Sequence, residues 1–177
     1  MEKNHWLELL SAQTQIKQVL DTVSYTEKFG LILSEEEAKL LTEERALSLK
    51  KERRVEFGQS ILQKIIYAFC DSSYIIQENY CETLMRLTDI FYMYKNEMAD
   101  EITDDELLEF MKEQFENVCF GDLDYLGGTC LDIFAQAVRA GYSGYKQSEG
   151  SGEFGQFDIV ARWDRELYLE ALQDCLI

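Results

Sequence analysis

Proline is absent from the 177-residue sequence, and histidine occurs only once, at His5. Without proline, no position forces a helix to end through a missing backbone N–H or a ring clash. The single histidine excludes zinc sites built from several imidazoles and the paired histidines of di-iron helical bundles. It also leaves Ser-His-Asp and Cys-His systems with no base except one near the N-terminus. The sequence therefore favours long helices and disfavours these catalytic chemistries.

Long apolar runs are also missing. No stretch approaches the ~20 apolar residues of a membrane-spanning helix, and the first residues lack the apolar core of a secretory signal. The cysteines are odd in number, widely spaced and without a Cys-x-x-Cys pair, which is typical of reduced, mostly buried thiols in a cytoplasmic protein. A four-thiolate metal site would need the fold to gather cysteines that no local spacing brings together. The five are Cys70, Cys81, Cys119, Cys130 and Cys175.

Basic residues are scarce. The chain has 17 Lys and Arg against 34 Asp and Glu, a formal net charge of −17 at pH 7. This charge repels nucleic-acid phosphates and anionic membranes, so we expect neither as a partner. The one basic cluster, Lys50-Lys51-Glu52-Arg53-Arg54, lies among acids and is expected to pair with them. A basic partner, a bound cation or simple solubility all fit the charge.

Apolar residues repeat at steps of three and four over six segments, which predicts a mainly α protein, a compact multi-helix bundle. Capping boxes at Ser34-Glu-Glu-Glu37 and Thr103-Asp-Asp-Glu106 mark two helix starts. The longest uninterrupted apolar stripe lies on residues 79–98. The expected helices cover approximately residues 6–23, 34–54, 59–70, 79–98, 103–118, 130–140 and 167–175. The helix at 59–70 has a broad apolar face that suggests a central position. The helix at 103–118 places five apolar residues on one face: Leu107, Leu108, Met111, Phe115 and Val118.

The length fits a single domain. We expect a helical domain over residues 1–140, a glycine-rich loop or linker over 141–157, and a closing segment over 158–177 that belongs to the same domain. Phe29, Leu31 and Leu33 alternate in strand fashion. One short strand pair, around 29–33 and 157–161, is therefore expected beside the helices.

Two partial motifs fail on inspection. Asp122-Leu-Asp-Tyr-Leu-Gly127 begins like a calcium-binding loop, but Leu126 and Ile133 occupy ligand positions. We expect instead a turn in which Asp122 caps a short helical segment. Gly150-Ser-Gly-Glu-Phe-Gly155 matches Gly-x-Gly-x-x-Gly, but no strand precedes it and only 22 residues follow it. We interpret it as a loop.

Carboxylates are the one reactive group in abundance, and they concentrate around residues 97–109. They are candidate contacts for Mg²⁺ or Ca²⁺. All-α nucleotide pyrophosphatases need a second pair of acids at a set spacing, which is missing here, so the other interpretation is a solvated linker and a helix N-terminus. No residue is assigned as a metal ligand. The candidate cation contacts are Glu97, Asp100, Glu101, Asp104, Asp105 and Glu109.

Four large side chains, Phe91-Tyr-Met-Tyr94, are adjacent and must point all around a helix. Some of them either pack against a second neighbour or form an exposed adhesive patch. The candidate interaction patch consists of Phe91, Tyr92, Met93, Tyr94, Lys95 and Glu97.

Residues 55–139 contain three segments that are similar to those of a known family: Glu56-Phe-Gly58, Phe69-Cys-Asp-Ser72 and the segment from Phe91 to Glu97. This region resembles an uncharacterised family of small acidic proteins of anaerobic Firmicutes. The resemblance implies a bacterial, cytoplasmic setting. Because the family has no assigned activity, it transfers no functional residue.

The sequence favours a helical interaction or regulatory module without catalytic activity or cofactor, which binds an unidentified protein or a second copy of itself. The alternative is a carboxylate-based, divalent-metal-dependent hydrolase of a phosphorylated small molecule, which rests on the density of acids alone.

Overall fold

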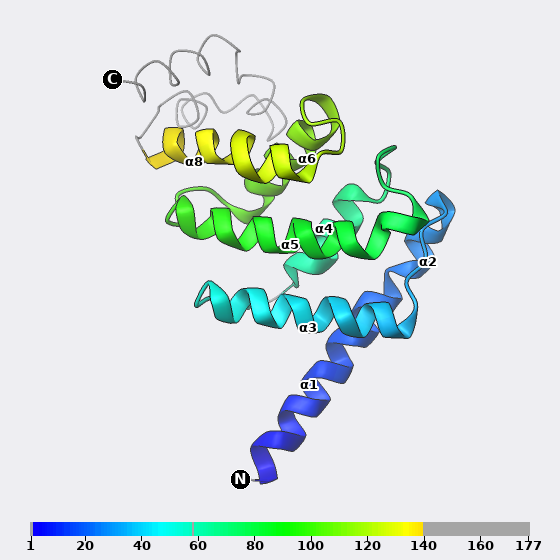
Figure 1. The fold of residues 1–177 in the computed structure, drawn as a ribbon. Helices are drawn as coiled ribbons and strands as arrows, with labels where there is room; N and C mark the ends of the chain where they lie inside the picture. The colour runs from blue at the N-terminus through cyan, green and yellow to red at the C-terminus, as the bar shows by residue number, and fades with distance from the viewer. Residues whose placement is uncertain (1, 58, 140–177) are drawn as a thin grey trace, which may run out of the picture. The chain divides into compact units, whose positions relative to one another are not determined.

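The computed structural model describes residues 2–57 and 59–139, and every regular element in these ranges is helical (Figure 1). The predicted mainly α class is confirmed. The chain divides into two compact units, residues 1–92 and 93–177, with the boundary inside one helix. The predictions for the loop 141–157, the segment 158–177, the strand at 157–161 and Cys175 lie outside the described residues.

All six helices expected within the described residues are present, and the helix expected at 167–175 lies outside them. The first unit contains α1 (Glu2–Asp21), α2 (Val23–Thr26), the 3-10 turn η1 (Glu27–Phe29), α3 (Glu35–Lys51), α4 (Ile61–Phe69), the 3-10 turn η2 (Gln77–Asn79) and most of α5 (Tyr80–Glu97). The second contains the end of α5, then α6 (Asp104–Asn117), α7 (Leu123–Tyr125), the π-helical turn η3 (Leu126–Cys130) and α8 (Leu131–Arg139).

The core of the first unit is built on α4, as its broad apolar face predicted. All five of its aliphatic and aromatic positions at helical spacing are buried: Ile61, Leu62, Ile65, Ile66 and Phe69. From α5, Leu84, Leu87 and Phe91 are buried as well. Each such side chain stabilises the fold by roughly 1.5–3 kcal/mol through its removal from water.

Both predicted capping boxes are confirmed. The Ser34 side chain accepts from the backbone N–H of Glu37, whose carboxylate accepts from the backbone N–H of Ser34. Thr103 and Glu106 repeat this exchange at the start of α6. Each box satisfies two backbone groups that would otherwise lack partners, which fixes where the helix begins.

The predicted strand at residues 29–33 is wrong. Its alternation is real, since Leu31 and Leu33 are buried whereas Ile32 is 53% exposed. A side chain takes the place of a neighbouring strand: the backbone N–H of Ile32 donates to Gln77 Oε1 at 2.7 Å, and Gln77 Nε2 donates to the Ile32 carbonyl at 2.8 Å. The Gln77 amide thus satisfies both backbone groups of Ile32, and Thr26 exchanges hydrogen bonds with the backbone of Leu31, so this extended segment needs no neighbouring strand.

In the second unit, α6 buries Leu107, Leu108, Met111 and Phe115 as predicted. Val118, which was expected on the same face, is 42% exposed because α6 ends at Asn117 and the chain turns through the positive φ of Phe120. The predicted cap at Asp122 is confirmed, since its side chain accepts from the backbone N–H of Tyr125.

Candidate functional site

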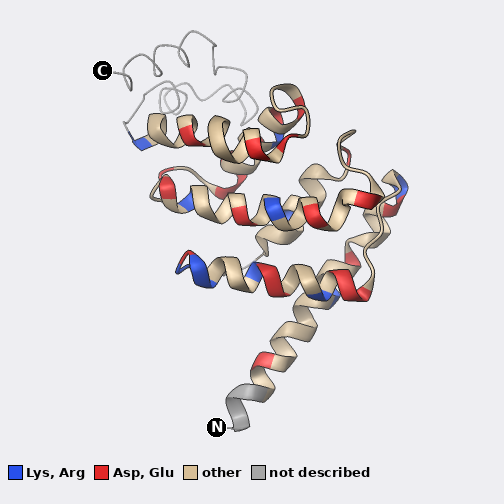
Figure 2. Cartoon of the chain, viewed as in Figure 1, with Lys and Arg blue, Asp and Glu red and all other residues tan. Residues whose placement is uncertain are grey.

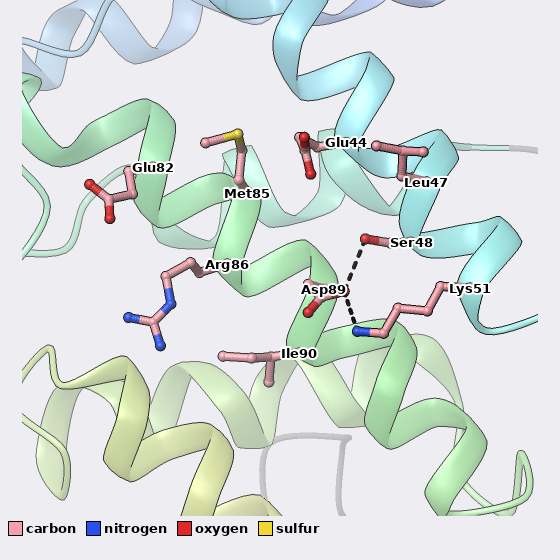
Figure 3. A pocket seen from close by; sticks show the side chains of 9 residues that line it. All are labelled: Glu44, Leu47, Ser48, Lys51, Glu82, Met85, Arg86, Asp89 and Ile90. Carbon is pink, nitrogen blue, oxygen red and sulfur yellow. Dashed lines mark hydrogen bonds and ion pairs between the residues drawn. The ribbon is translucent and has the colours of Figure 1, made fainter.

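A pocket of about 630 Å³ lies between α3 and α5 within the first unit (Figure 3). Residues spaced by three and four form each wall, so each helix contributes one face. We call this pocket the α3–α5 groove. It is lined by Glu44, Leu47, Ser48 and Lys51 from α3 and by Glu82, Met85, Arg86, Asp89 and Ile90 from α5.

Asp89 connects the two walls of the groove. Its Oδ1 accepts a hydrogen bond from Ser48 Oγ at 3.1 Å and lies 3.5 Å from Lys51 Nζ (Figure 3). The Ser48 hydroxyl therefore uses its proton in a hydrogen bond across the groove. Neither histidine nor cysteine lines the groove. The lining therefore contains neither the Ser-His nor the Cys-His pair of covalent catalysis.

The acids around residue 97 surround a cation that the chain itself supplies. Lys95 is only 5% exposed, and its Nζ donates to the carbonyl of Ile102 and lies 3.0 Å from Asp104 and 3.9 Å from Asp100. A buried ammonium needs such partners, because leaving it unpaired costs several kcal/mol. Asp100 and Asp104, two of the candidate cation contacts, therefore neutralise the charge of Lys95.

The other acids of this run do not converge. Glu97 pairs with Arg139 at 3.0 Å, and Glu101 and Asp105 are exposed. Partial burial, with Glu106 and Asp105 nearby, raises the pKa of Glu109. Within residues 2–57 and 59–139, no three Asp, Glu, His or Cys side chains are arranged to hold a metal ion. The geometry therefore gives the metal-dependent hydrolase no support.

The aromatic segment of the candidate interaction patch faces inward. Phe91, Tyr92 and Tyr94 are 1%, 2% and 5% exposed, which leaves Met93 half-buried and Glu97 exposed. The sequence left two interpretations open, packing on two sides of the helix or an exposed adhesive patch. The three aromatic residues are packed. The Tyr94 hydroxyl donates to the carbonyl of Gly127, and the Phe91 and Tyr92 rings pack edge to face.

Sequence reasoning missed a polar cluster around Glu56, which lies on the connection between α3 and α4. Glu56 Oε2 accepts from Arg45 Nη2 at 2.6 Å, from Arg45 Nε at 3.0 Å and from the Tyr92 hydroxyl. Glu56 Oε1 accepts from the backbone N–H of Ile61, at the start of α4. Arg45 Nη1 reaches Gln15 of α1 at 3.3 Å. One carboxylate thus links three helices and, through Arg45, a fourth.

The cluster is well shielded from water. The side chains of Arg45 and Glu56 are 11% and 10% exposed. Burial is the main cause that raises the pKa of Tyr92, and the nearby Glu56 carboxylate raises it further. The phenol therefore remains a hydrogen-bond donor. The only sequence signal was the Glu56-Phe57-Gly58 segment of the family resemblance, which did not indicate the partners.

Two thiols also meet inside the second unit. Cys119 and Cys130 are buried, with their Sγ atoms 3.6 Å apart. Burial raises the pKa of Cys119 to about 12, so this thiol stays protonated at neutral pH. The predicted burial is confirmed for Cys70, Cys119 and Cys130, whereas Cys81 is half-buried.

The N-terminal half of α1 carries a large exposed apolar surface, in a segment for which the sequence predicted only a helix. Trp6, Leu7, Leu9 and Leu10 are 67%, 65%, 43% and 56% exposed. We call these four residues the apolar end of α1. Farther along α1, Val19 is buried and Gln15 and Gln18 contact α3 and α4 (Figure 1). Only the C-terminal half of α1 is therefore anchored in the first unit.

None of the described helices combines the length and the apolar character that crossing a bilayer requires. The apolar end of α1 is short and is followed by the polar stretch Ser-Ala-Gln-Thr-Gln.

Of three comparisons with known proteins, only the comparison with family models found a match. The model of a family of unknown function, DUF6323, matches residues 18–144. Neither the curated proteins nor the solved structures contain a match to the chain. The matched range includes α3, the Glu56 cluster, the α3–α5 groove and the Cys119–Cys130 pair, whereas the apolar end of α1 precedes it.

Proposed function

Because the chain belongs to the DUF6323 family, whose function is unknown, we propose a function from its own geometry: a protein-interaction module that works by contact and not by catalysis. The apolar end of α1 is the contact surface. This proposal rests on one observation, the exposure of four large apolar side chains within five consecutive residues of a helix.

An exposed leucine alone needs no explanation, but a contiguous cluster does. Exposed parts of a tryptophan and three leucines together leave on the order of 400 Å² of apolar surface in water. At roughly 25 cal/mol per Å², burying it against a partner yields about 10 kcal/mol before the costs of association. Tryptophan is also a residue type that dominates the energetics of protein interfaces.

The rest of the described chain supports contact over catalysis. The polar side chains that come together do so to stabilise the fold: Glu56 with Arg45, and Lys95 with Asp104. The α3–α5 groove offers a second, more polar recess in the same unit, lined by neither histidine nor cysteine.

Photo-crosslinking in the host cell tests the proposal. The residue p-benzoylphenylalanine replaces Leu7 in the full chain, and the same substitution at Phe57, which is 87% exposed on the α3–α4 connection, serves as the control. We expect a discrete adduct from position 7 that is absent from position 57. The absence of a discrete adduct at position 7, or the same adduct pattern at both positions, would contradict the proposed function.

A further inference from the structure

The composition of the apolar end of α1 points to its partner. Between Trp6 and Ile16 the only charged residue is Glu8, whereas the whole chain carries a net charge of −17 (Figure 2). A surface of this protein that is to contact another strongly acidic body must be nearly uncharged, because like charges brought together cost several kcal/mol. The apolar end of α1 meets that condition.

The arrangement of the four residues is symmetric about Glu8. Trp6 and Leu10 flank it at a distance of two residues, and Leu7 and Leu9 flank it at a distance of one. At 3.6 residues per turn the four side chains occupy a sector of roughly 160°, and Glu8 points to the opposite side of the helix. The apolar sector is therefore continuous and free of charge.

This symmetry makes the segment complementary to itself. When two such helices pack antiparallel about a twofold axis at residue 8, Trp6 of one copy meets Leu10 of the other in the middle of the interface. Leu7 then meets Leu7 along one edge, and Leu9 meets Leu9 along the other. Both Glu8 side chains then face solvent. A twofold interface requires that each surface patch fit its own copy, and this sequence has that property.

We propose that the apolar end of α1 binds a second copy of this chain and that the two helices pair antiparallel. This proposal rests on the proposed function. The buried surface from the four residues of each copy totals on the order of 800 Å², and flanking residues add to it, which is below the roughly 1,200 Å² of stable specific interfaces and in the range of weak, transient ones. The dimer is therefore weak. Salt strengthens it, because salt screens the repulsion between two acidic bodies and leaves apolar burial intact.

Sedimentation velocity of the purified full chain, over a dilution series at about 20 mM and about 300 mM NaCl, tests the dimer. We expect a monomer–dimer equilibrium that shifts at least several-fold toward dimer in the higher salt. In the double variant Trp6→Glu, Leu10→Glu we expect a monomer at every concentration. The matched control Phe57→Glu, Ile76→Glu removes two exposed apolar residues elsewhere in the first unit and adds the same charge, and should dimerise like the parent.

Trp6 fluorescence shows whether this side chain is covered, in a dimer or in a monomer. In a Trp163→Phe variant, Trp6 is the sole tryptophan, and its emission should shift to the blue as the concentration rises. A monomer with solvent-exposed Trp6 throughout would overturn the dimer. A monomer with blue-shifted Trp6 would overturn it too, because another part of the same chain would then cover the surface. In either case a crosslinked adduct between position 7 and a different protein would leave the proposed function standing.

Discussion

At the scale of single residues, the first unit depends on one carboxylate. Glu56 accepts hydrogen bonds from α3, α4 and α5 at once, and it supplies the acceptor that Ser60 does not provide at the start of α4. Its negative charge also suits the positive end of that helix. The same residue thus neutralises Arg45 and organises the approach of three helices.

Replacing Glu56 with Gln should therefore cost more than an ordinary ion pair. The variant keeps the shape but leaves the Arg45 guanidinium without a counterion at a site where its side chain is 11% exposed. We expect a loss of about 2–4 kcal/mol in the free energy of unfolding by urea denaturation, and about 1 kcal/mol for Tyr92→Phe. Lys39→Ala is the control, because the Lys39–Glu43 pair is 65% and 58% exposed and should change stability by less than about 0.5 kcal/mol. Equal effects of Glu56→Gln and Lys39→Ala would contradict the role of the cluster.

Buried phenols and thiols make stability sensitive to alkaline pH. Burial raises the pKa of Tyr80 and of Tyr94 from 10.0 to about 12, and that of Cys119 from 9.0 to about 12. As the pH rises from about 9 to about 12, the unfolded chain loses these protons progressively, whereas the folded chain holds them until about pH 12. The folded state then binds more protons, so its free energy of unfolding falls as pH rises. Below pH 9 the full contribution is present.

We expect cooperative loss of helical circular dichroism in this alkaline range, with tyrosinate absorbance appearing together with unfolding. Tyr80 alone, which is 1% exposed, contributes on the order of 2 kcal/mol of this loss. In Tyr80→Phe the free energy of unfolding should decline less steeply between pH 10 and 12. The decrease in slope should correspond to about one fewer proton released on unfolding. Tyrosinate absorbance from Tyr80 in a fully helical protein at pH 11 would contradict this prediction.

At the scale of helices, the side chains at the N-caps differ in what they do. Ser34 and Thr103 each accept from a backbone N–H, whereas Ser60, at the same position of α4, makes no capping hydrogen bond. Replacement by Ala should cost about 1 kcal/mol at Ser34 and at Thr103. At Ser60 it should cost less than about 0.5 kcal/mol, since Glu56 serves that helix. Thermal and urea denaturation of the three variants under one set of conditions would measure the difference.

Helix positions were predictable because their signals are local. The capping boxes at Ser34 and Thr103, the stripe on α5 and the five buried residues of α4 all depend on residues within a few turns of each other. The alternation at Leu31–Leu33 was also local, but its partner was the Gln77 side chain, 45 positions away. A single sequence carries no signal for such a contact.

Candidate sites were less predictable for the same reason. The acid run was visible, but its meaning depended on Lys95 being buried among those acids. The aromatic segment was visible, but its burial depends on neighbours from other helices. Glu56, Cys119 and Cys130 became notable only once folding brought them to their partners. The apolar end of α1 has a helical pattern that fits a core position equally well, and its exposure of 43–67% was not encoded in that pattern.

At the scale of the whole molecule, the net charge of −17 opposes every compact arrangement of the chain, since acids outnumber basic residues twofold in a folded volume. The apolar cores of both units offset this repulsion, and the ion pairs Lys39–Glu43, Lys51–Asp89 and Glu97–Arg139 are exposed to screening by salt. Stability should therefore depend on ionic strength in the direction opposite to that of a protein held by surface salt bridges. We expect the melting temperature to rise by several degrees between about 20 mM and about 300 mM NaCl.

A single charge reversal separates this global repulsion from local pairing. Glu113 is exposed near the end of α6, one turn after Glu109, and the last turn of that helix contains no basic residue. Glu113→Lys should raise the free energy of unfolding by about 0.5–1 kcal/mol in low salt, because it lowers the net charge and places a cation near the negative end of a helix. Glu113→Gln removes the charge without adding a cation and should gain about half as much. Both gains should shrink as NaCl screens them, and a gain that is unchanged by about 300 mM NaCl would show that packing and not charge is responsible.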